Sequence, residues 1–351
     1  MKMKLSNSLV SFFSASFLLF SVASARSQRV RYYYNAILYV FSLGICSTIG
    51  VLYPLLFGIF GQRYNTNYVV ARSFYMIAGT LIGYNVSLKG AEHLKTRPGI
   101  IVGNHQSFLD ILYLGCVMPR RSVIMAKKEL KIFPILGQFM MLSGTLFIDR
   151  KSRASAIKTM SEGGARMRRE ELALFAFPEG TRSHSILPEL LPFKKGVFHL
   201  AIETQLPIIP VVCENYSRIY DSKTRFEGGD LRLVALPPIS TQGMTDKDTG
   251  KLIETVHDAM LKQLLELDQD NDSKDAAYAA HPSSIDPPRV RGLAGLFARI
   301  FGDGRSHQHN RTIRRVARDE DARRANAHGG TQPSDYGLVS SAHSTTSVST
   351  S

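Results

Sequence analysis

The chain contains no tryptophan and only three cysteines among its 351 residues. Cys46, Cys116 and Cys213 lie far apart in the sequence and form no CxxC pair. This excludes a disulfide framework and a cysteine-rich zinc site as the basis of the fold. An apolar fraction of 44% with 21% charged residues likewise excludes a wholly disordered or collagen-like chain. The length predicts one core domain with appended segments.

Acidic residues are scarce relative to basic ones, with 29 Asp+Glu against 43 Lys+Arg and a formal net charge of +14. Such a charge calls for an anionic partner: nucleic acid, a membrane surface or a phosphorylated substrate. The excess lies in two zones, since residues 118–169 hold 12 Lys+Arg against three acids and residues 289–324 hold ten Arg against four. Neither zone has a zinc-finger spacing, a basic-zipper pattern or an RNA-recognition signature. Nucleic acid therefore stays one of the three candidate partners here, but no nucleic-acid-binding motif supports it.

The N-terminal 25 residues combine basic residues with an apolar run. Lys2 and Lys4 precede residues 5–25, which are mostly apolar or small, and the run closes with the A-x-A pattern Ala23-Ser24-Ala25. This arrangement is typical of a secretory signal peptide. A first transmembrane segment that is retained has a similar composition, so both interpretations of residues 1–25 stand.

A second apolar stretch, residues 32–60, carries no charged side chain over 29 positions. As a helix it would exceed the roughly 30 Å of hydrocarbon in a bilayer. We therefore predict a transmembrane helix, with three tyrosines at its start (Tyr32–Tyr34) in the interfacial aromatic belt and a kink or early end at Pro54. A third stretch, residues 67–84, contains Arg72 and is predicted to be an interfacial or partly inserted helix.

From about residue 85 the pattern changes to short apolar runs separated by helical periodicity. Short runs bounded by turn residues are typical of buried strands, and strands that alternate with helices predict a parallel sheet. We therefore predict an α/β domain with a mostly parallel central sheet over residues 85–268. Its expected strands are Ile100–Val102, Val123–Met125, Thr145–Ile148, Leu172–Phe177, Ile208–Val212 and Leu231–Ala235, and its expected helices are Ser152–Glu170, Gly196–Thr204 and one that starts at Asp248 or Thr249.

Residues 269–351 form a low-complexity basic tail that is predicted to be disordered. One amphipathic segment, residues 289–301, interrupts this tail. A basic amphipathic helix suits a membrane surface, but an ordinary short helix fits the pattern equally well. Its apolar residues, which recur at helical spacing among arginines, are Leu293, Leu296, Phe297, Ile300 and Phe301.

The first predicted strand ends in the polar block NHQSFLD, residues 104–110. On one continuous helix His105 and Asp110 would be about 140° apart and would not meet. If His105 instead lies in the turn after the strand, Asp110 in the first turn of the next helix can reach back to it. The carboxylate would then fix the imidazole tautomer while the other ring nitrogen acts as a general base. A satisfied polar histidine beside an aspartate at a helix N-terminus fits the same spacing, so this HX4D pair alone identifies no catalytic site.

Three further blocks accompany other predicted strands. FPEGTRS at 177–183 combines a forced turn, a glycine that allows close approach of a ligand, and a guanidinium suited to phosphate. GTLFIDR at 144–150 delivers Arg150 to the end of a strand, where it would bind a ligand or simply cap the strand. LPIIPVV at 206–212 has no titratable group, so it can shape a site but cannot run a reaction.

In this order and spacing, NHQSFLD, MAKKEL around Lys127, LFIDR, FPEGTRS and LPIIPVV resemble the 1-acyl-glycerol-3-phosphate acyltransferase (lysophosphatidic acid acyltransferase) family. The resemblance covers about residues 85–265 and shows no departure in the core residues of these blocks. Each block alone is unspecific, but their combination is very specific. The resemblance therefore favours the catalytic interpretation of His105 and Asp110 and implies a glycerolipid acyltransferase-type domain.

The resemblance implies transfer of a fatty acyl group from acyl-CoA to the sn-2 hydroxyl of 1-acyl-glycerol-3-phosphate, which gives phosphatidic acid and CoA. His105 would take the hydroxyl proton and Asp110 would orient His105, without an acyl-enzyme. The sequence agrees, because it contains neither a GxSxG nucleophile elbow nor an HExxH motif. We see no cluster of metal ligands and expect neither a metal ion nor a cofactor, acyl-CoA being a co-substrate.

The resemblance also assigns acceptor-binding residues. Lys127, Arg150 and Arg182 would hold the acceptor phosphate. Glu179 would order the turn at Gly180 or the acceptor, and Gly180 and Thr181 would help to position the acceptor. We further expect a backbone N–H near Gly180 to stabilise the oxyanion.

Two alternative functions stay open. A sister acyltransferase would use glycerol-3-phosphate or another lysophospholipid, and the sequence does not reveal the acceptor pocket. A catalytically inactive lipid-binding membrane protein is opposed by the complete set of His105, Asp110, Glu179, Gly180 and Arg182. The expected partners are acyl-CoA, lysophosphatidic acid and the bilayer, with no nucleic acid and no obligatory protein partner. The resemblance suggests an integral protein of the endoplasmic reticulum membrane with its catalytic domain facing the cytosol.

Overall fold

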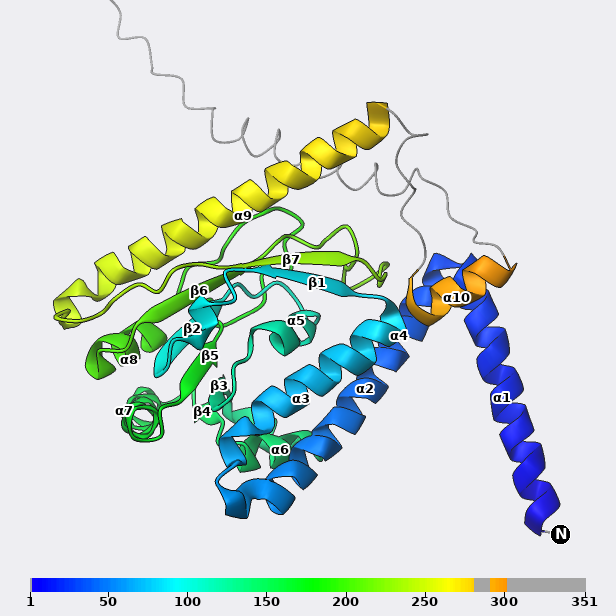
Figure 1. The fold of residues 1–351 in the computed structure, drawn as a ribbon, viewed down its shortest axis with the longest axis horizontal. Helices are drawn as coiled ribbons and strands as arrows, with labels where there is room; N and C mark the ends of the chain where they lie inside the picture. The colour runs from blue at the N-terminus through cyan, green and yellow to red at the C-terminus, as the bar shows by residue number, and fades with distance from the viewer. Residues whose placement is uncertain (1, 281–290, 302–351) are drawn as a thin grey trace, which may run out of the picture. The chain divides into compact units, whose positions relative to one another are not determined.

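The computed structural model describes residues 2–280 and 291–301, and its centre is a seven-stranded sheet with the order β1-β7-β6-β2-β5-β3-β4 (Figure 1). Neighbouring strands are parallel except for β6 and β7, which are antiparallel. The prediction of an α/β fold with a mostly parallel sheet is confirmed. The strands are β1 (Asn85–Lys89), β2 (Gly99–Gly103), β3 (Ser122–Lys127), β4 (Leu146–Ile148), β5 (Ala173–Ala176), β6 (Ile208–Cys213) and β7 (Asp230–Ala235).

Helices precede the sheet, connect its strands and follow it. They are α1 (Lys2–Arg26), α2 (Gln28–Phe57), α3 (Thr66–Phe74), α4 (Thr80–Ile82), α5 (Asp110–Val117), α6 (Leu136–Leu142), α7 (Arg153–Arg169), α8 (Gly196–Thr204), α9 (Thr249–Ala280) and α10 (Gly292–Phe301). A π-helical turn, Tyr75–Gly79, joins α3 to α4. Short 3-10 turns lie at Gly58–Phe60, Arg63–Asn65, His93–Lys95, Lys128–Ile132 and Asp246–Asp248.

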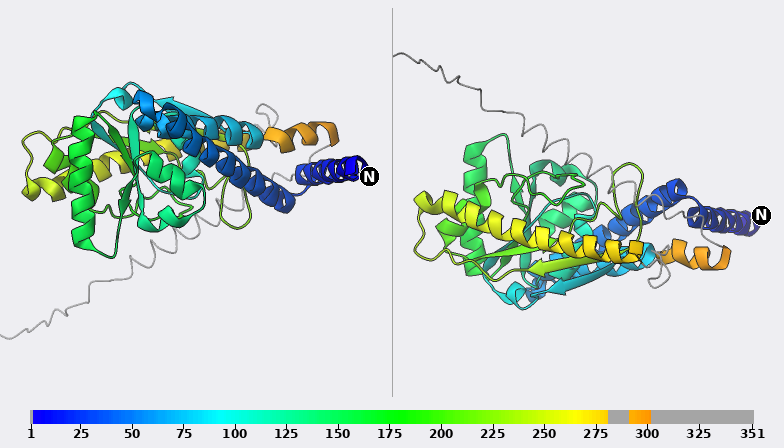
Figure 2. Two further views of the ribbon diagram at one scale, coloured as in Figure 1. Left: turned by 90° about the horizontal axis from the view of Figure 1, so that it is seen from below. Right: turned by 90° about the horizontal axis from the view of Figure 1, so that it is seen from above.

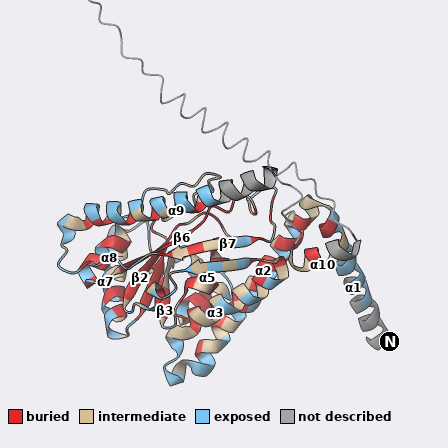
Figure 3. Ribbon diagram, turned by 45° about the horizontal axis from the view of Figure 1, so that its top comes forward, coloured by how far each residue is buried: buried red, intermediate tan, exposed pale blue. Residues whose placement is uncertain are grey.

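The sheet is covered by helices on both faces (Figure 2). On β2, Ile101 packs with the layer formed by α2, α3, α5 and α6, whereas Ile100 and Val102 pack with the layer formed by α7, α8 and α9. Every residue of β2, β5 and β6 is buried (Figure 3). Strands buried on both faces have no polar side to present, which is why they read in the sequence as short continuous apolar runs.

Helix α2 carries the stretch that is predicted to cross a membrane. It begins after Ser27, whose side chain accepts the N–H of Val30, and it ends at Phe57, one turn beyond Pro54. Among the described residues one helix, Gln28–Phe60 with its final 3-10 turn, is long and apolar enough to span a bilayer. Only 22% of its most apolar window is buried, which opposes a role as an ordinary core helix, although a signal sequence passes the same test.

The two faces of α2 have different surroundings. Tyr39 and Cys46 are fully buried against the domain, whereas Ile37 and Phe41 are 59% and 63% exposed. A core helix hides its apolar side chains, so an exposed apolar face of this kind marks a contact with lipid or with another protein. The helix therefore contributes to the core of the domain on one side and leaves the other side free.

The segment 67–84 forms α3, the π-helical turn and α4. Its side chains Val70, Phe74, Ala78 and Ile82 recur every fourth residue and are buried in the same core cluster as α2 and α5. One face of this segment is therefore part of the protein core. Any contact with lipid is limited to the opposite face, where Met76 is 67% exposed.

The ends of the chain differ from the predicted boundaries. Residues 2–26 form one continuous helix, and α9 runs to Ala280, past the predicted end of the domain at residue 268. The rest of the predicted tail, apart from residues 291–301, lies outside the described residues, including nearly all of the part that was predicted to be disordered. The predicted amphipathic segment contains α10.

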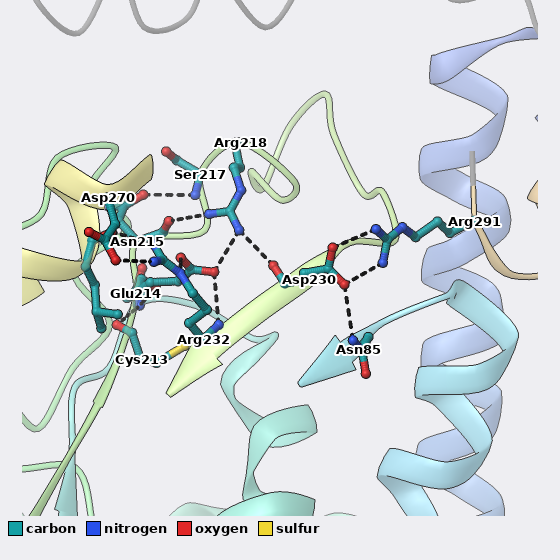
Figure 4. Close-up of polar contacts among 12 residues, drawn as sticks. Asn85, Cys213, Glu214, Asn215, Ser217, Arg218, Asp230, Arg232, Asp270 and Arg291 are labelled. Carbon is teal, nitrogen blue, oxygen red and sulfur yellow. Dashed lines mark hydrogen bonds and ion pairs between the residues drawn. The ribbon is translucent and has the colours of Figure 1, made fainter. Parts of the chain in front are cut away.

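Helix α10 is attached to the domain by an ion pair and a close backbone contact. The guanidinium of Arg291 donates to both carboxylate oxygens of Asp230 at 2.7 and 2.6 Å, and Asn85 donates to the same carboxylate at 3.3 Å (Figure 4). A Cβ added to Gly83 would lie 2.3 Å from the Arg291 Cβ and 2.3 Å from the Gly292 nitrogen. Only a residue without a side chain permits this approach.

We expect Gly83→Ala to lower the midpoint of thermal unfolding more than Gly243→Ala. Both glycines have a positive φ, 88° and 77°, so alanine at either site has the cost of a left-handed backbone, about 1–2 kcal/mol. At Gly83 the new methyl group would also collide with the segment that leads into α10, whereas at Gly243 it would meet nothing within 4 Å. Calorimetry of the two detergent-solubilised variants measures the difference, and equal losses would contradict the close contact.

Candidate active site

The predicted site residues lie at one edge of the sheet. Strands β2, β5, β3 and β4 are adjacent and parallel, so their carboxyl ends share an edge. In open α/β sheets ligands bind at this edge. His105 follows β2, residues 179–182 follow β5, Lys127 ends β3, and Arg150 follows β4. With neighbouring strands about 4.8 Å apart, β2 and β4 are separated by roughly 14 Å. All eight predicted site residues therefore lie on or beside loops at the same edge.

His105 and Asp110 are in direct contact. Asp110 is the first residue of α5, and its Oδ2 lies 2.7 Å from Nδ1 of His105 in the loop after β2. The same oxygen accepts the N–H groups of Gln106 and Ser107 at 2.8 and 3.0 Å. Because an ionised carboxylate only accepts hydrogen bonds, the contact holds the proton of a neutral imidazole on Nδ1. Nε2 is then left with a free lone pair, as a general base requires.

The imidazole ring is also held from a second loop. It stacks on the ring of Phe177, with 3.9 Å between centroids and 13° between planes. Ser183 N–H donates to the His105 carbonyl at 2.9 Å, and His184 N–H donates to the Gln106 carbonyl at 3.0 Å. The side chain of His105 remains 17% exposed. The loop after β5 therefore fixes the histidine without sealing it from a substrate.

Glu179 is buried, and its carboxylate accepts a hydrogen bond from the backbone of the His105 loop instead of facing solvent. Its side chain is 1% exposed, Oε1 accepts the N–H of His105 at 2.6 Å, and Oε2 accepts the N–H of Leu191 at 3.1 Å. Burial raises the pKa of Glu179 to about 7, although the two N–H donors act in the opposite direction. Both oxygens are engaged with backbone, so this carboxylate positions His105, a role that the sequence did not suggest.

Gly180 makes the turn at the end of β5 possible, with φ at 70°. Its own N–H donates to the Phe177 carbonyl at 3.1 Å, so this group does not point at a substrate. The next two N–H groups, of Thr181 and Arg182, have no hydrogen-bond acceptor among the described residues. The expected oxyanion donor near Gly180 is thus not the Gly180 N–H itself.

The three predicted phosphate-binding cations are exposed at this edge. In the described part of the chain, Lys127, Arg150 and Arg182 form no ion pair with a carboxylate. By contrast, the neighbouring Lys128 is paired with Asp149 at 3.0 Å. The Arg182 guanidinium lies 5.6 Å from the centroid of the Phe108 ring, which places it beside the His105 loop. Unpaired cations around the His105 loop suit an anionic substrate.

The loop after β6 adds residues that the sequence did not single out. Asn104 exchanges hydrogen bonds with the backbone of Cys213 at 2.9 and 2.8 Å, and Gln106 donates to the Glu214 carbonyl at 2.9 Å. Tyr216 donates from its hydroxyl to Oδ1 of Asp110 at 2.5 Å. Asn104 and Gln106 stand in the recognised block NHQSFLD, but Tyr216 belongs to none of the recognised blocks. Its position just after a predicted strand was the only signal.

Buried ion pairs hold that loop in place. Glu214 is fully buried and accepts from Arg218 at 2.7 Å and from Arg232 at 2.9 Å (Figure 4). Arg232 of β7 also pairs with Asp270 of α9 at 3.0 Å. Because a buried carboxylate is costly unless it is paired, these contacts specify the path of the chain on both sides of Tyr216.

Another contact reaches the site from α2. The hydroxyl of Tyr39 donates to the Phe108 carbonyl at 2.8 Å, and the Tyr39 ring packs against the Phe108 ring with centroids 4.7 Å apart. The apolar helix is thus joined directly to the loop that carries His105.

As for metals, no cluster of three or more His, Cys, Asp and Glu side chains suited to an ion occurs in the described residues.

The comparisons with known proteins agree with this geometry. An acyltransferase family model matches residues 85–214. A 1-acyl-sn-glycerol-3-phosphate acyltransferase of Saccharomyces cerevisiae is 40% identical over 240 residues, which cover 68% of this chain and 79% of that protein. The human 1-acyl-sn-glycerol-3-phosphate acyltransferase beta is 34% identical over 257 residues, which cover 72% of this chain and 91% of the relative.

A solved structure is also similar. The crystal structure of the 1-acyl-sn-glycerophosphate acyltransferase PlsC from Thermotoga maritima superposes with a TM-score of 0.51 at 25% sequence identity. The match covers 68% of this chain and 98% of that chain. The sequence and the fold therefore point to one family.

We expect Glu179→Gln to change the pH dependence of stability. The folded carboxyl has a pKa of about 7 against an ordinary 4.5, so unfolding releases a proton between these values and rising pH favours unfolding. At about 1.4 kcal/mol per pKa unit, the free energy of unfolding of the parent relative to the variant should fall by up to roughly 3 kcal/mol from pH 4.5 to 7 and then level off.

Denaturant unfolding of both proteins across pH 4.5 to 8 measures this difference. Glu254→Gln, at an exposed position on α9, is the matched control and should give a difference that does not vary with pH. A pH-independent difference for Glu179→Gln as well would contradict the raised pKa.

Proposed function

Because the chain belongs to the 1-acyl-sn-glycerol-3-phosphate acyltransferase family, we propose that it transfers a fatty acyl group from acyl-CoA to the sn-2 hydroxyl of 1-acyl-sn-glycerol-3-phosphate. The products would be phosphatidic acid and free CoA. The activity as a 1-acylglycerol-3-phosphate acyltransferase follows from the family. The donor, the mechanism and the residue roles are the proposal, and the 2.7 Å contact between His105 and the buried Asp110 is the observation that carries it.

The proposed reaction uses His105 as a proton carrier. Nε2 takes the proton of the sn-2 hydroxyl while the hydroxyl oxygen attacks the thioester carbonyl. The resulting tetrahedral intermediate collapses, the C–S bond breaks, and the imidazolium returns its proton to the CoA sulfur. Asp110 holds Nδ1 and stabilises the imidazolium without taking its proton. The acyl group passes directly from sulfur to oxygen, so no acyl-enzyme forms.

The oxyanion of the intermediate needs preorganised donors. The N–H groups of Thr181 and Arg182 are the candidates, because they lack an acceptor among the described residues and follow the Gly180 turn beside His105. Lys127, Arg150 and Arg182 are proposed to hold the acceptor phosphate. A guanidinium binds phosphate through two parallel hydrogen bonds, while an ammonium acts as a point charge.

The site is proposed to work at a membrane. Helix α2 is long and apolar enough to cross a bilayer, exposes apolar side chains on one face, and contacts the His105 loop through Tyr39 on the other. A lysolipid acceptor resides in a bilayer, whereas acyl-CoA arrives from water. We therefore propose that the catalytic domain faces the cytosol and, from the family resemblance, that the membrane is that of the endoplasmic reticulum. No metal ion and no cofactor is part of the proposed reaction.

We expect His105→Ala to lower kcat by about 10²- to 10⁴-fold while the protein still folds, because the general base is removed but Asp110 keeps its backbone donors and Tyr216. The assay follows labelled acyl-CoA into phosphatidic acid in purified membranes supplied with lysophosphatidic acid. His93→Ala, in the turn before β2 and away from the carboxyl edge, is the control and should keep full activity. Full turnover by His105→Ala would remove the general-base assignment.

We expect Arg182→Ala to raise the KM for lysophosphatidic acid by about tenfold or more, since it removes a charge-assisted contact with phosphate. An acceptor without phosphate, 1-acylglycerol, should be used equally by the parent and the variant. Lys89→Ala is the matched control, because β1 runs opposite to β2 and Lys89 ends it at the far edge of the sheet.

A loss of the same size with both acceptors would contradict phosphate binding by Arg182. Adding glycerol-3-phosphate and other lysophospholipids to the same panel distinguishes the proposed acceptor from those of sister acyltransferases, because the parent protein should prefer lysophosphatidic acid.

A further inference from the structure

The carboxylate of Asp110 has two oxygens with different partners. Oδ2 accepts three hydrogen bonds, from His105 Nδ1 and from the N–H groups of Gln106 and Ser107. Asp110 is fully buried, so Oδ1 has no access to bulk water. An oxygen of a buried carboxylate without a donor would carry a large desolvation cost. The structure gives Oδ1 one side-chain donor, the hydroxyl of Tyr216 at 2.5 Å.

Towards Asp110, Tyr216 is placed to donate a hydrogen bond and not to accept one. It is 2% exposed, and burial, followed by the negative charge of Asp110, raises the pKa of Tyr216 well above its ordinary value, so the phenol keeps its proton. Its oxygen also lies 2.7 Å from Ser107 Oγ, which in turn accepts the N–H of Leu109 at 3.0 Å. Since the phenol proton goes to Asp110, the Ser107 hydroxyl must donate to the phenol oxygen.

The resulting chain of donors runs in one direction, from Ser107 to Tyr216 to Asp110, with His105 on the other carboxylate oxygen. Hydrogen bonds to both oxygens fix the rotation of the carboxylate, and this rotation determines where Oδ2 meets the imidazole. Tyr216 belongs to the loop after β6, and β6 is the neighbour of β2 on the side away from β5. Tyr216 therefore donates to the Asp110 carboxylate from the side of the site opposite to the Phe177 loop.

We propose that Tyr216 is a positioning residue of the catalytic pair, which acts through Asp110 to hold His105 in the geometry and tautomer for proton transfer. The inference rests on the proposed role of His105 and Asp110. Tyr216 is 2% exposed and its hydroxyl is engaged by Asp110 and Ser107, so it is proposed to act through Asp110 and not through a substrate. Its contribution should therefore appear in turnover and in the ionisation of the catalytic pair, and not in substrate binding.

The test is Tyr216→Phe, which keeps the buried ring and removes only the hydroxyl. We expect kcat to fall by about 10- to 100-fold, the effect of losing one hydrogen bond to a charged group, while the KM values for acyl-CoA and lysophosphatidic acid stay within about twofold. Without the phenol the carboxylate holds more negative charge and binds the imidazolium, or its own proton, more tightly. In a plot of kcat against pH, the acidic limb should therefore move to higher pH.

The matched control is Tyr84→Phe. Tyr84 is also buried, at 6% exposure, but its hydroxyl has no hydrogen-bond partner in the described structure, so kcat and its pH profile should be unchanged. A double-mutant cycle measures the coupling between Tyr216 and Asp110. In the Asp110→Asn background, Tyr216→Phe should lower kcat little further, because the phenol acts through that carboxylate.

Two outcomes would overturn the inference. One is an unchanged kcat and pH profile for Tyr216→Phe while His105→Ala is inactive, which would leave the proposed function intact. The other is full additivity with Asp110→Asn. If Tyr216→Phe unfolds, replacing Tyr216 by 3-fluorotyrosine keeps the contact and makes the phenol a stronger donor. The acidic limb should then move to lower pH, and an unmoved limb would refute the role of Tyr216.

Discussion

The structure of the site depends on one buried charge. Asp110 is fully buried, and an ionised carboxylate is stable in such a place only when donors surround it. The donors come from its own loop, from His105, and from Tyr216 on the neighbouring strand's loop. This requirement explains why the polypeptide after β2 turns back over the start of α5. The loop after β6, which carries Tyr216, is itself held by the buried Glu214 and its arginines.

The candidate site is also connected to the apolar helix α2, which has one face in the core and one face exposed. Arg31, near the start of α2, is 1% exposed and forms a bidentate ion pair with Glu227, with both contacts at 2.8 Å. About two helical turns later, Tyr39 donates to the Phe108 carbonyl in the His105 loop. The apolar helix is thus part of the structure that supports the proposed catalytic pair. The position of the helix and that of the histidine are therefore set together, which suits the proposed uptake of the acceptor from a bilayer.

Much of the fold could be predicted from local patterns, and the exceptions have physical causes. Gly196–Thr204 was predicted with its observed bounds, and the strands buried on both faces appeared as apolar runs. β1 was missed because its side chains alternate between exposed and half-buried positions, which leaves no apolar run. α6 was missed because its seven residues lie within a nearly continuous apolar stretch that shows no helical period.

The sequence by itself determined the α/β class, the order of the blocks and the side chains that are proposed to carry the chemistry, because apolar runs, turn residues and motif spacing are local properties. The tertiary structure alone decided that Glu179 serves the His105 backbone, that the Gly180 N–H is used within its own turn, and that Tyr216 contacts Asp110 from 106 residues away. The physical reason is the strand order: β5 and β6 flank β2, and no window of sequence contains that adjacency.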